Sequence, residues 1–521
     1  MNKDSTYSPI VFSFVLLVGI FIGDFFFNGK NAVQNPNKFD LLLDQLDEIY
    51  VDSIDKDELT EQAVQFLIKE LDPHSNYIPA QDLAAVNEPM QGSFDGIGIE
   101  FNLQKDTILV VAPISGGPSQ IVGIQSGDKI IIVDDDTIAG TELTNEKVFK
   151  LLRGEKGTKV KLGILRNNQI IDFELNRDKI PIYSVDVSYM IDAKTGYIKV
   201  NRFSSTTYKE FREASKKLLK SGMKKLVLDL RDNPGGYLGA SINISNEFLS
   251  GDKLIVFTKG RDGIENEFYS NNDGLLKQTE VVAIINEGSA SASEIVAGAI
   301  QDNDRGTIVG RRSFGKGLVQ EQFQNIDGSA YRITTQRYYT PTGRCIQRPY
   351  NIGEKENYND DIFDRYENGE LFYEDSIPRI DSLKYTTPNG KIVFGGGGIS
   401  PDVFVAIDTS KFHNDINQLI RKGILREFTF IYTEQLRQEL LLMGIKNFIE
   451  KFEIDMQTLK ELKLYCEKQK QQFELNNFNN NDLKILKTQL KAQVGRNIWN
   501  DDAFFPVINE IDNTFQRALN Y

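Results

Sequence analysis

Two apolar runs constrain the fold of this chain more than any other feature. Residues 226–230 (Leu-Val-Leu-Asp-Leu) and residues 281–285 (Val-Val-Ala-Ile-Ile) have the length of strands, and each is followed by a glycine-bearing turn and a helical pattern. Strands that are apolar on both faces are typical of the parallel sheet of an α/β domain. We therefore predict an α/β domain between about Tyr183 and Asp408.

The rest of the chain has patterns that predict separate domains. In residues 36–92 apolar side chains recur at spacings of three and four, which indicates a small helical region. Residues 93–178 change to short β-branched strands separated by glycines, which predicts a compact β-rich module. Residues 409–521 are rich in Lys, Glu, Gln and Asn and are again helical in pattern. The predicted fold class is α/β multidomain, with helical segments at both ends.

The first part of the chain is strongly apolar. A run from Pro9 to Gly23 is followed by Phe25-Phe26-Phe27, and its length lies between that of a signal-peptide core and that of a membrane-spanning helix. Because no small-residue cleavage motif follows, we predict an uncleaved N-terminal membrane anchor at residues 1–30, with the remainder outside the cytoplasm. Signal cleavage and a buried core helix are the alternatives.

Composition excludes several classes of function. Lys+Arg number 60 and Asp+Glu 74, and the resulting net charge of −14 repels nucleic acid. Cys345 and Cys466 are far apart and lack C-x-x-C spacing, so neither a disulfide framework nor a thiolate zinc site is indicated. The only histidines are His74 and His413, which leaves little room for Ser-His-Asp or His-rich metal chemistry. We expect no metal site and no nucleic-acid partner.

The most informative stretch for chemistry follows the apolar run at 281–285. It contains Ser289-Ala-Ser291-Ala-Ser293-Glu294, a turn of small residues that leads into a helical pattern. Such a turn places a hydroxyl beside free backbone N–H groups at the positive end of a helix, where an oxyanion is stabilised. The alternative is structural, because Ser291 and Glu294 have the spacing of a helix capping box.

A second stretch supplies a candidate base. Lys316 lies between two glycines and leads into an apolar stretch. A neutral amine can activate a serine hydroxyl when burial lowers the lysine pKa, and the sequence offers no better base. Gln320, four residues further on, is expected to hold the amine by a hydrogen bond, and a solvated strand residue is its alternative interpretation.

Two glycine turns are candidate binding loops. Gly235 and Gly236 follow the strand at 226–230, and their missing side chains let a backbone N–H approach a ligand closely. A plain tight turn is the alternative. In the β-rich module a glycine-containing loop enters a strand, as in sites that bind the terminal carboxylate of a peptide added to a sheet edge. This loop is Gly96-Ile97-Gly98-Ile99.

Taken together, these motifs resemble those of the carboxyl-terminal processing peptidases, also called tail-specific proteases. The resemblance covers about Phe39 to Asp408 and implies a PDZ domain at residues 93–178 and a ClpP/crotonase-like serine peptidase core at residues 180–408. The matching motifs are Leu71-Asp-Pro-His-Ser75, Gly96-Ile-Gly-Ile99, Leu230-Arg-Asp-Asn-Pro-Gly-Gly236, Gly288-Ser-Ala-Ser-Ala-Ser-Glu-Ile295, Gly315-Lys316-Gly317, Tyr338-Tyr-Thr-Pro-Thr-Gly343 and Gly397-Gly398-Ile-Ser-Pro401-Asp402.

The resemblance also implies roles for individual residues. The nucleophile of the family falls on Ser291, its general base on Lys316 and its supporting glutamine on Gln320, and no cofactor is needed. The implied oxyanion donors are backbone N–H groups of Ala292 and of the Gly235-Gly236 turn. The implied peptide-binding residues are Gly96, Ile97, Gly98, Ile99 and Arg153, of which Arg153 matches an arginine that links peptide binding to activation.

The implied function is a serine endopeptidase that captures the C-terminus of a protein substrate in its PDZ groove and cuts nearby. The isoleucine-lined groove predicts substrates with apolar C-termini. Together with the predicted anchor, the resemblance implies an inner-membrane protein with its catalytic domain in the periplasm, and an adaptor or homo-oligomer as a possible partner. A catalytically silent PDZ scaffold is the alternative, although the intact trio of Ser291, Lys316 and Gln320 favours the enzyme.

Overall fold

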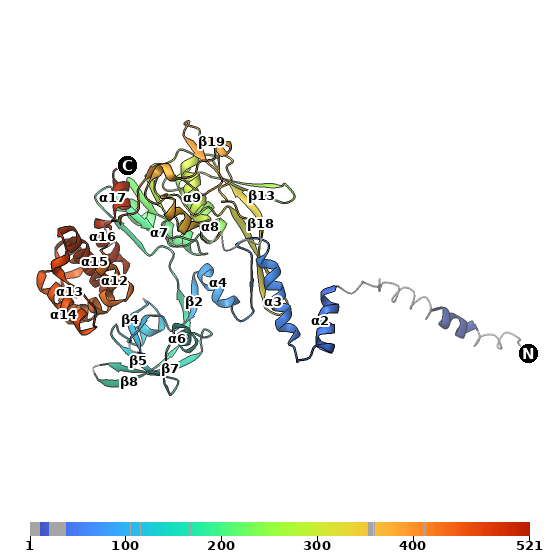
Figure 1. Ribbon diagram of the computed structural model, residues 1–521, viewed down its shortest axis with the longest axis horizontal. Coiled ribbons are helices and arrows are strands. Elements are labelled where there is room, and N and C mark those ends of the chain that lie inside the picture. Colours follow the sequence, from blue (N-terminus) through green and yellow to red (C-terminus); the bar gives the residue numbers. More distant parts are fainter. Residues whose placement is uncertain are drawn as a thin grey trace, which may run out of the picture. The chain divides into compact units, whose positions relative to one another are not determined.

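Figure 1 shows the computed structural model of the 521-residue chain. The chain divides into two compact units, Met1–Glu70 and Leu71–Tyr521. The residues that the structure describes are 11–19, 38–104, 106–114, 116–166, 168–352, 358, 360–409 and 413–521.

The first unit is helical where it is described. Residues 11–19 form one helix, and α2 (Lys38–Ile49) and α3 (Lys56–Lys69) follow. α3 begins at Asp55, whose side chain accepts hydrogen bonds from the backbone N–H groups of Asp57 (3.0 Å) and Glu58 (3.1 Å). An aspartate in this position satisfies N–H groups that a helix leaves open at its start.

The predicted N-terminal membrane anchor requires correction. Within the described ranges, no helix has both the length and the apolar character that crossing a membrane requires. Residues 1–10 and 20–30 of the predicted anchor lie outside the described residues. The predicted single N-terminal pass through the inner membrane, on which the predicted location was based, is wrong on this finding.

The β-rich module contains an antiparallel sheet in the order β3-β4-β5-β7-β8, with β6 paired to β5. α6 buries Val148 and Leu152 against the apolar core of this sheet. β2 pairs with β9, so the chain enters and leaves the module at one place. The elements are β2 (Ser93–Gly96), β3 (Ile99–Leu103), β4 (Ile108–Pro113), α5 (Pro118–Ile121), β5 (Lys129–Val133), β6 (Asp136–Thr137), α6 (Asn145–Leu152), β7 (Lys159–Arg166), β8 (Gln169–Asn176) and β9 (Asp178–Pro181).

The α/β core is built on a six-stranded sheet in the order β10-β11-β12-β15-β16-β21. Every neighbouring pair is parallel except β10 and β11. β12 and β15 are the strands predicted from the two apolar runs, and they pair with Leu226 opposite Val281. The predicted fold class is confirmed. The strands are β10 (Val187–Met190), β11 (Thr195–Lys199), β12 (Lys225–Asp229), β15 (Glu280–Ile285), β16 (Thr307–Gly310) and β21 (Val403–Phe404).

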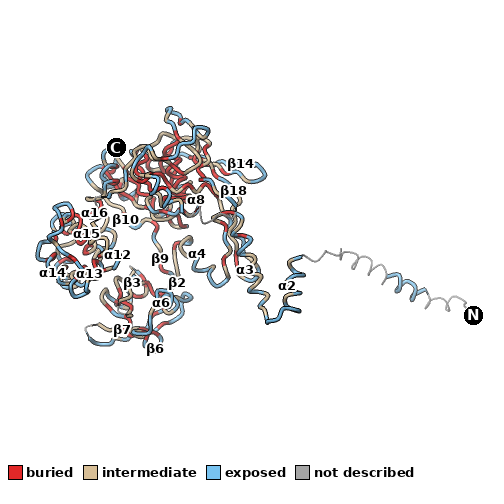
Figure 2. Tube along the Cα trace, viewed as in Figure 1, coloured by how far each residue is buried: buried red, intermediate tan, exposed pale blue. Residues whose placement is uncertain are grey.

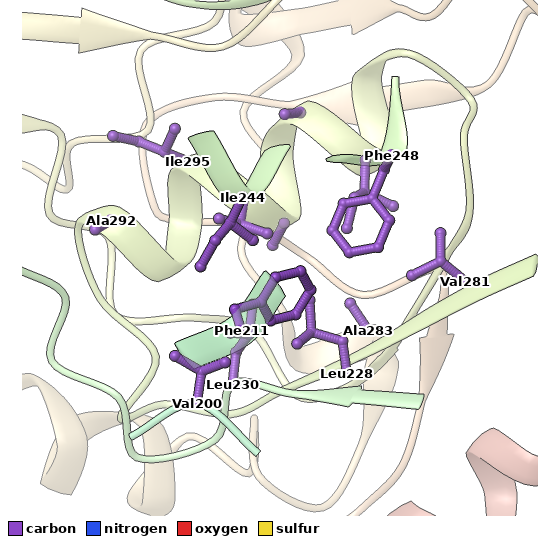
Figure 3. Packing of buried hydrophobic residues seen from close by; sticks show 14 of the residues in the cluster. Val200, Phe211, Leu228, Leu230, Ile244, Phe248, Val281, Ala283, Ala292 and Ile295 are labelled. Atoms are coloured by element: carbon purple, nitrogen blue, oxygen red, sulfur yellow. The ribbon is translucent and has the colours of Figure 1, made fainter. Parts of the chain in front are cut away.

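Helices cover both faces of this sheet. Successive strand residues point to opposite faces, so Leu226 and Leu228 pack with one helical layer and Val227 with the other. The first layer comprises α7 (Thr207–Lys220), α8 (Leu238–Phe248) and α9 (Ala292–Asp302), and Figure 3 shows its packing at close range. The second layer includes α17 (Asn513–Leu519) and Phe505 of α16 (Asp501–Ile508). Figure 2 shows the buried residues concentrated in this core.

A second sheet in the core carries the strand that follows Lys316. Its order is β1-β18-β13-β14, and β17 pairs with β18. The remaining elements around it are a short hairpin, β19 with β20, and several short helices. These elements are β1 (Asn76–Ile78), α4 (Leu83–Gln91), β13 (Leu254–Gly260), β14 (Glu265–Tyr269), β17 (Leu318–Gln324), β18 (Ala330–Tyr339), α11 (Asp361–Glu367), η2 (Glu374–Ser376), η3 (Asp381–Leu383), β19 (Lys384–Thr386) and β20 (Ile392–Phe394).

Helices dominate the chain from residue 413 onward, as predicted. Two apolar clusters hold them together, with Leu459, Leu462 and Cys466 fully buried in one and Phe448 in the other. α17 lies in the predicted C-terminal extension but packs on the core sheet. The elements before the return to the sheet are α12 (Asn414–Arg421), α13 (Ile424–Lys451), α14 (Met456–Lys468), η5 (Leu475–Asn477) and α15 (Asn480–Trp499), and η6 (Asn509–Ile511) lies between α16 and α17.

Candidate active site

Ser291 stands at the junction of β15 and α9. It is the N-cap residue of α9, and its backbone lies at φ 54° and ψ −112°. A non-glycine residue in this region stores strain of about 1–3 kcal/mol, and such strain clusters at functional sites. Ser291 also forms the predicted capping box with Glu294, so the structural interpretation holds and does not exclude a chemical one.

Of the three serines in the turn, only Ser291 is partly exposed. The hydroxyls of the other two are buried and donate to the neighbouring loop. Ser289 Oγ donates to the carbonyl oxygen of Leu230 (2.8 Å), and Ser293 Oγ donates to that of Asn233 (3.0 Å). The turn therefore fastens itself to the loop after β12 with two serines and leaves the middle one available to a substrate.

Glu294 connects the nucleophile turn to the base. Its carboxylate is fully buried, and Oε2 accepts the backbone N–H groups of Ser291 (2.8 Å) and Lys316 (2.9 Å). Oε1 accepts the Ser313 hydroxyl (2.5 Å) and the Gly315 N–H (2.7 Å). Burial raises the pKa of Glu294, and these hydrogen bonds act against the rise. One carboxylate oxygen thus holds the backbones of Ser291 and Lys316 together.

Tyr338 makes a second link between the same two residues. Its hydroxyl lies 3.0 Å from the carbonyl oxygen of Ser291 and 2.6 Å from that of Lys316, so one donor bridges two acceptors. The side chain is 1% exposed, and burial raises its pKa well above the ordinary value. Because Glu294 binds the two N–H groups and Tyr338 the two carbonyls, the relative position of Ser291 and Lys316 is fixed on both sides of the backbone.

Lys316 has the protonation behaviour that a base needs. Burial, with a smaller effect of the nearby Arg332 charge, lowers its pKa from 10.5 to about 8. Its Nζ donates to Oε1 of Gln320 (2.9 Å), and Gln320 Nε2 donates to the carbonyl oxygen of His74 (2.7 Å). The described hydrogen bonds include none between Lys316 Nζ and Ser291 Oγ. Catalytic hydrogen bonds are often long before substrate binds.

The Gly235-Gly236 turn lies directly against the nucleophile turn. A Cβ atom on Gly235 (φ 98°) would lie 2.8 Å from Ser291 Cβ and 2.9 Å from the Ala292 nitrogen. A Cβ atom on Gly236 (φ 146°) would lie 2.1 Å from the carbonyl oxygen of Phe203. Neither position accepts a side chain without moving its neighbours, so the close approach requires glycine.

The backbone N–H groups of this region differ in whether they already have an acceptor. The N–H of Gly235 donates to Oδ1 of Asn233 (2.9 Å) and is therefore engaged. The N–H groups of Gly236 and Ala292 have no acceptor within the described chain. The prediction of oxyanion donors thus narrows to Gly236 and Ala292, while Gly235 supplies the close approach.

The loop at residues 96–99 of the β-rich module is held in place by Ser119. The carbonyl oxygen of Ile97 accepts both the N–H (3.0 Å) and the hydroxyl (2.7 Å) of Ser119, and Ile97 is buried. Gly98 has a φ of 74°, and Gly96 and Ile99 end β2 and begin β3. The N–H groups of Ile97 and Gly98 have no acceptor among the residues described.

Arg153 lies at the end of α6 and contacts the helix that precedes the module. Its Nη1 pairs with Oε2 of Glu88 (2.5 Å), and its guanidinium lies over the rings of Phe94 (4.8 Å) and Phe149 (4.7 Å). No described hydrogen bond joins it to the loop at residues 96–99. The structure therefore connects Arg153 to α4 and leaves its predicted link to peptide binding as a prediction.

Three residues that carry the site were missed by the sequence reasoning. Glu294 received only a capping role, and neither Tyr338 nor Asn233 received a role of its own. Tyr338 and Asn233 belong to motifs that the resemblance had already marked, which was the available signal. No group of His, Cys, Asp and Glu in the described residues has the arrangement of a metal site.

Comparisons with known proteins show which families parts of this chain resemble. Residues 194–358 match the model of peptidase family S41, residues 96–176 that of the PDZ domain, and residues 416–500 a family of unknown function. The chain is 36% identical over 321 residues to the "Probable CtpA-like serine protease" of Staphylococcus aureus (strain N315), covering 61% of this chain and 64% of that protein. The corresponding protein of Staphylococcus epidermidis (strain ATCC 12228) is 35% identical over 325 residues, with 61% and 65% covered.

The matches thus span slightly less than two thirds of the length of these curated relatives. Among solved structures, the photosystem II D1 C-terminal processing protease is 26% identical and covers 74% of this chain and 95% of that chain, with a TM-score of 0.37. A PDZ domain of a carboxy-terminal protease from Vibrio cholerae, in complex with a peptide, is 29% identical and covers 17% and 97%, with a TM-score of 0.16. The family matches confirm the resemblance seen in the sequence.

Proposed function

We propose that this chain, with a core matched by peptidase family S41 and a module matched by the PDZ domain, is a serine endopeptidase of the C-terminal processing type. Its reaction is hydrolysis of a peptide bond in a protein substrate. The observation that carries the proposal is the pair of clamps, Glu294 and Tyr338, which hold a strained, partly exposed serine next to a buried lysine. A PDZ scaffold without catalysis has no use for this arrangement.

In the first half of the reaction Ser291 Oγ attacks the scissile carbonyl carbon while neutral Lys316 Nζ takes the hydroxyl proton. The N–H groups of Gly236 and Ala292 stabilise the developing oxyanion. When the tetrahedral intermediate collapses, the C–N bond breaks, and the lysine ammonium gives its proton to the leaving amine. An ester between Ser291 and the N-terminal part of the substrate remains.

In the second half water cleaves this ester. Lys316, again neutral, removes a proton from the attacking water, and the same two N–H groups stabilise the second oxyanion. Collapse breaks the bond between Ser291 Oγ and the acyl carbon, the Lys316 ammonium returns a proton to Oγ, and the product with its new carboxyl terminus is released. With a pKa of about 8, roughly a tenth of the lysine is neutral at pH 7, so the base is available without a histidine.

Gln320 supports the base in this scheme. Its amide oxygen accepts a hydrogen bond from Lys316 Nζ, and its amide nitrogen is held by the carbonyl oxygen of His74. The amide therefore has a fixed orientation, and it directs the amine without adding a charge that would raise the lysine pKa.

The PDZ module supplies recognition. We assign the substrate's terminal carboxylate to the N–H groups of Ile97 and Gly98, which have no acceptor among the described residues. They lie in a loop that runs from Gly96 to Ile99. The substrate class is proteins with apolar C-terminal residues. Arg153, paired with Glu88 on α4, is the candidate link between peptide binding and the core.

The test incubates the full chain with an unfolded protein that ends in an apolar tail and follows cleavage by mass spectrometry. Ser291→Ala and Lys316→Ala are expected to abolish cleavage while the fold is retained by circular dichroism. Lys316→Arg keeps a cation that stays protonated, so it is expected to be equally inactive. Lys259→Ala, which removes an exposed lysine paired with Glu265, is the matched control and should retain full activity.

A substrate with an amidated C-terminus separates recognition from catalysis. Slower cleavage of this substrate by wild type supports the PDZ route, and equal cleavage contradicts it. If wild type cleaves neither substrate but binds the tail peptide, the scaffold interpretation replaces the enzyme.

A further inference from the structure

The loop that carries Gly236 begins in a buried charge cluster at the end of β12. Asp229 is fully buried, and the guanidinium of Arg231 binds both of its carboxylate oxygens at 2.6–3.1 Å. Tyr197 donates its hydroxyl to the same carboxylate (2.8 Å), and Lys199 Nζ donates to the carbonyl oxygen of Arg231 (3.1 Å). Arg231 is therefore held at both its side chain and its backbone.

The third guanidinium nitrogen of Arg231 contacts a residue far along the chain. Its Nη1 donates to Oδ2 of Asp512 (2.7 Å). The other oxygen of Asp512 caps α17, accepting the N–H groups of Thr514 (3.0 Å) and Phe515 (3.0 Å). Asp512 thus uses one carboxylate oxygen for the helix and the other for the loop.

α17 packs against β15 and β16, and each of its ends is bonded to a residue at one end of β12. At the far end Lys225 Nζ, from the first residue of β12, donates to the carbonyl oxygen of Leu519 (2.9 Å). Between the two ends Phe515 (3% exposed) and Ala518 (0%) are buried against the sheet. The helix therefore belongs to the packed core, and Asp512 cannot move freely relative to β12.

The loop that begins at Arg231 is hydrogen-bonded to the turn that carries Ser291. Two residues further on, the carbonyl oxygen of Asn233 accepts the Ala290 N–H (2.9 Å) and the Ser293 hydroxyl (3.0 Å). The Asn233 side chain donates to the Val200 carbonyl (2.7 Å) and accepts the Gly235 N–H. A shift at Arg231 would therefore change where the Gly236 N–H lies relative to Ala292.

We propose that Asp512 is a positioning residue for catalysis, which sets the oxyanion loop through Arg231 and makes α17 a working part of the peptidase core. The inference rests on the proposed function. It gives a role in the reaction to the region beyond residue 408. The family that matches residues 416–500 has no known function and so does not supply this role.

The test replaces Asp512 by asparagine in the full chain. Asparagine caps a helix as well as aspartate does, so α17 is retained while the negative charge opposite Arg231 is removed. The matched control is Asp455→Asn, which makes the same change at the N-cap of α14, where Asp455 accepts the Thr458 N–H (2.8 Å). Asp512→Glu restores the charge and is the rescue variant.

Three readouts are made on each variant: kcat and KM on the tail-bearing substrate, thermal unfolding, and hydrogen–deuterium exchange of residues 230–240. For Asp512→Asn we expect kcat to fall about tenfold with KM changed less than about twofold, and Asp512→Glu to recover most of the loss. Amide exchange in the loop should rise by a similar factor, with unfolding temperature nearly unchanged. Asp455→Asn should alter none of these values.

Equal kcat for Asp512→Asn and wild type, or a loss matched by Asp455→Asn, would overturn the inference. A loss that follows the fraction of unfolded protein would overturn it as well. If wild type itself is inactive, the proposed function fails, and loop exchange decides the inference separately: faster exchange in Asp512→Asn supports the structural link, and unchanged exchange refutes it.

Discussion

Two fully buried carboxylates flank the candidate active site, and their surroundings differ. Glu294 is met by backbone N–H groups and a hydroxyl, and burial raises its pKa. Burial also opposes ionisation of Asp229, but the charges of Arg231 and Lys199 hold its pKa below the ordinary value. Since both side chains are 0% exposed, the partners decide the outcome.

The difference matches what each region does. Around Glu294 the donors include the backbone N–H groups of the nucleophile and the base, so the carboxylate fixes their relative position through hydrogen bonds. Around Asp229 the cations belong to a cluster that locks the start of the oxyanion loop. Hydrogen bonds position one side of the site, and ion pairs position the other.

The largest effect is expected from Glu294→Ala. Removing the carboxylate leaves buried donors without an acceptor and releases Lys316 from Ser291, so we expect activity to fall by at least about 1000-fold and the free energy of unfolding by about 3 kcal/mol. Peptide cleavage and urea unfolding measure the two quantities. Activity within tenfold of wild type would show that the Glu294 clamp is dispensable. Hydrogen bonds to Glu294 would then not be what positions the nucleophile and the base.

Gly236→Ala should come next, because its Cβ atom would collide with the carbonyl oxygen of Phe203. We expect a loss of about 100-fold in kcat, as for a displaced oxyanion donor. The control is Gly239→Ala, three residues further on in α8, where a Cβ atom meets nothing within 4 Å. That variant should keep its activity and gain about 0.5–1 kcal/mol in stability, because alanine is the better helix former.

Asp229→Asn tests the ion-paired side directly. The change leaves Arg231 with only Asp512 as a charged partner, so we expect the free energy of unfolding to fall by about 3 kcal/mol and kcat by a few tens of fold. Thermal unfolding and initial rates measure these effects. Glu265→Gln, which removes a carboxylate from an exposed pair with Lys259, should stay within about 0.5 kcal/mol of wild type.

The smallest expected effect is the pH dependence of activity, which is set by Lys316. The neutral amine is the active form, and the pKa of Lys316 is lowered to about 8, so activity should rise as pH increases through that value. We expect kcat/KM to increase about tenfold between pH 7 and pH 9 and to level off above. A midpoint near the ordinary lysine value of 10.5 would mean that burial does not depress this pKa.

The sequence contained the local parts of this site but not its connections. The apolar runs at 226–230 and 281–285 predicted β12 and β15, because strand composition is a local property. Ser291 and Lys316 were also identified, since each lies in a short motif. The Ser291–Glu294 contact was predicted as a capping box, but the bonds from Glu294 and Tyr338 to Lys316 each span 22 positions. Asp512 meets Arg231 across 281 positions, so no local spacing could reveal these longer-range contacts.

The failed prediction has a related cause. Apolar composition before residue 30 indicated a membrane helix, but composition does not fix how long a helix is. No helix among the described residues is both long and apolar enough to cross a membrane. In the core strands the apolar runs were a reliable guide, because each was followed by a glycine-bearing turn and a helical pattern.

The hydrogen bond from Asn513 Nδ2 to Asp408 (2.8 Å) has a consequence for the order of folding. The chain leaves the core sheet after β21, forms the helical domain and returns at α17, so the contacts of α17 with β12 close a very long loop. Closing a long loop costs entropy, and prior folding of the intervening helices shortens the effective loop by bringing its ends together. We therefore expect the helical domain to fold before the second face of the sheet is covered, and the peptidase core to mature last.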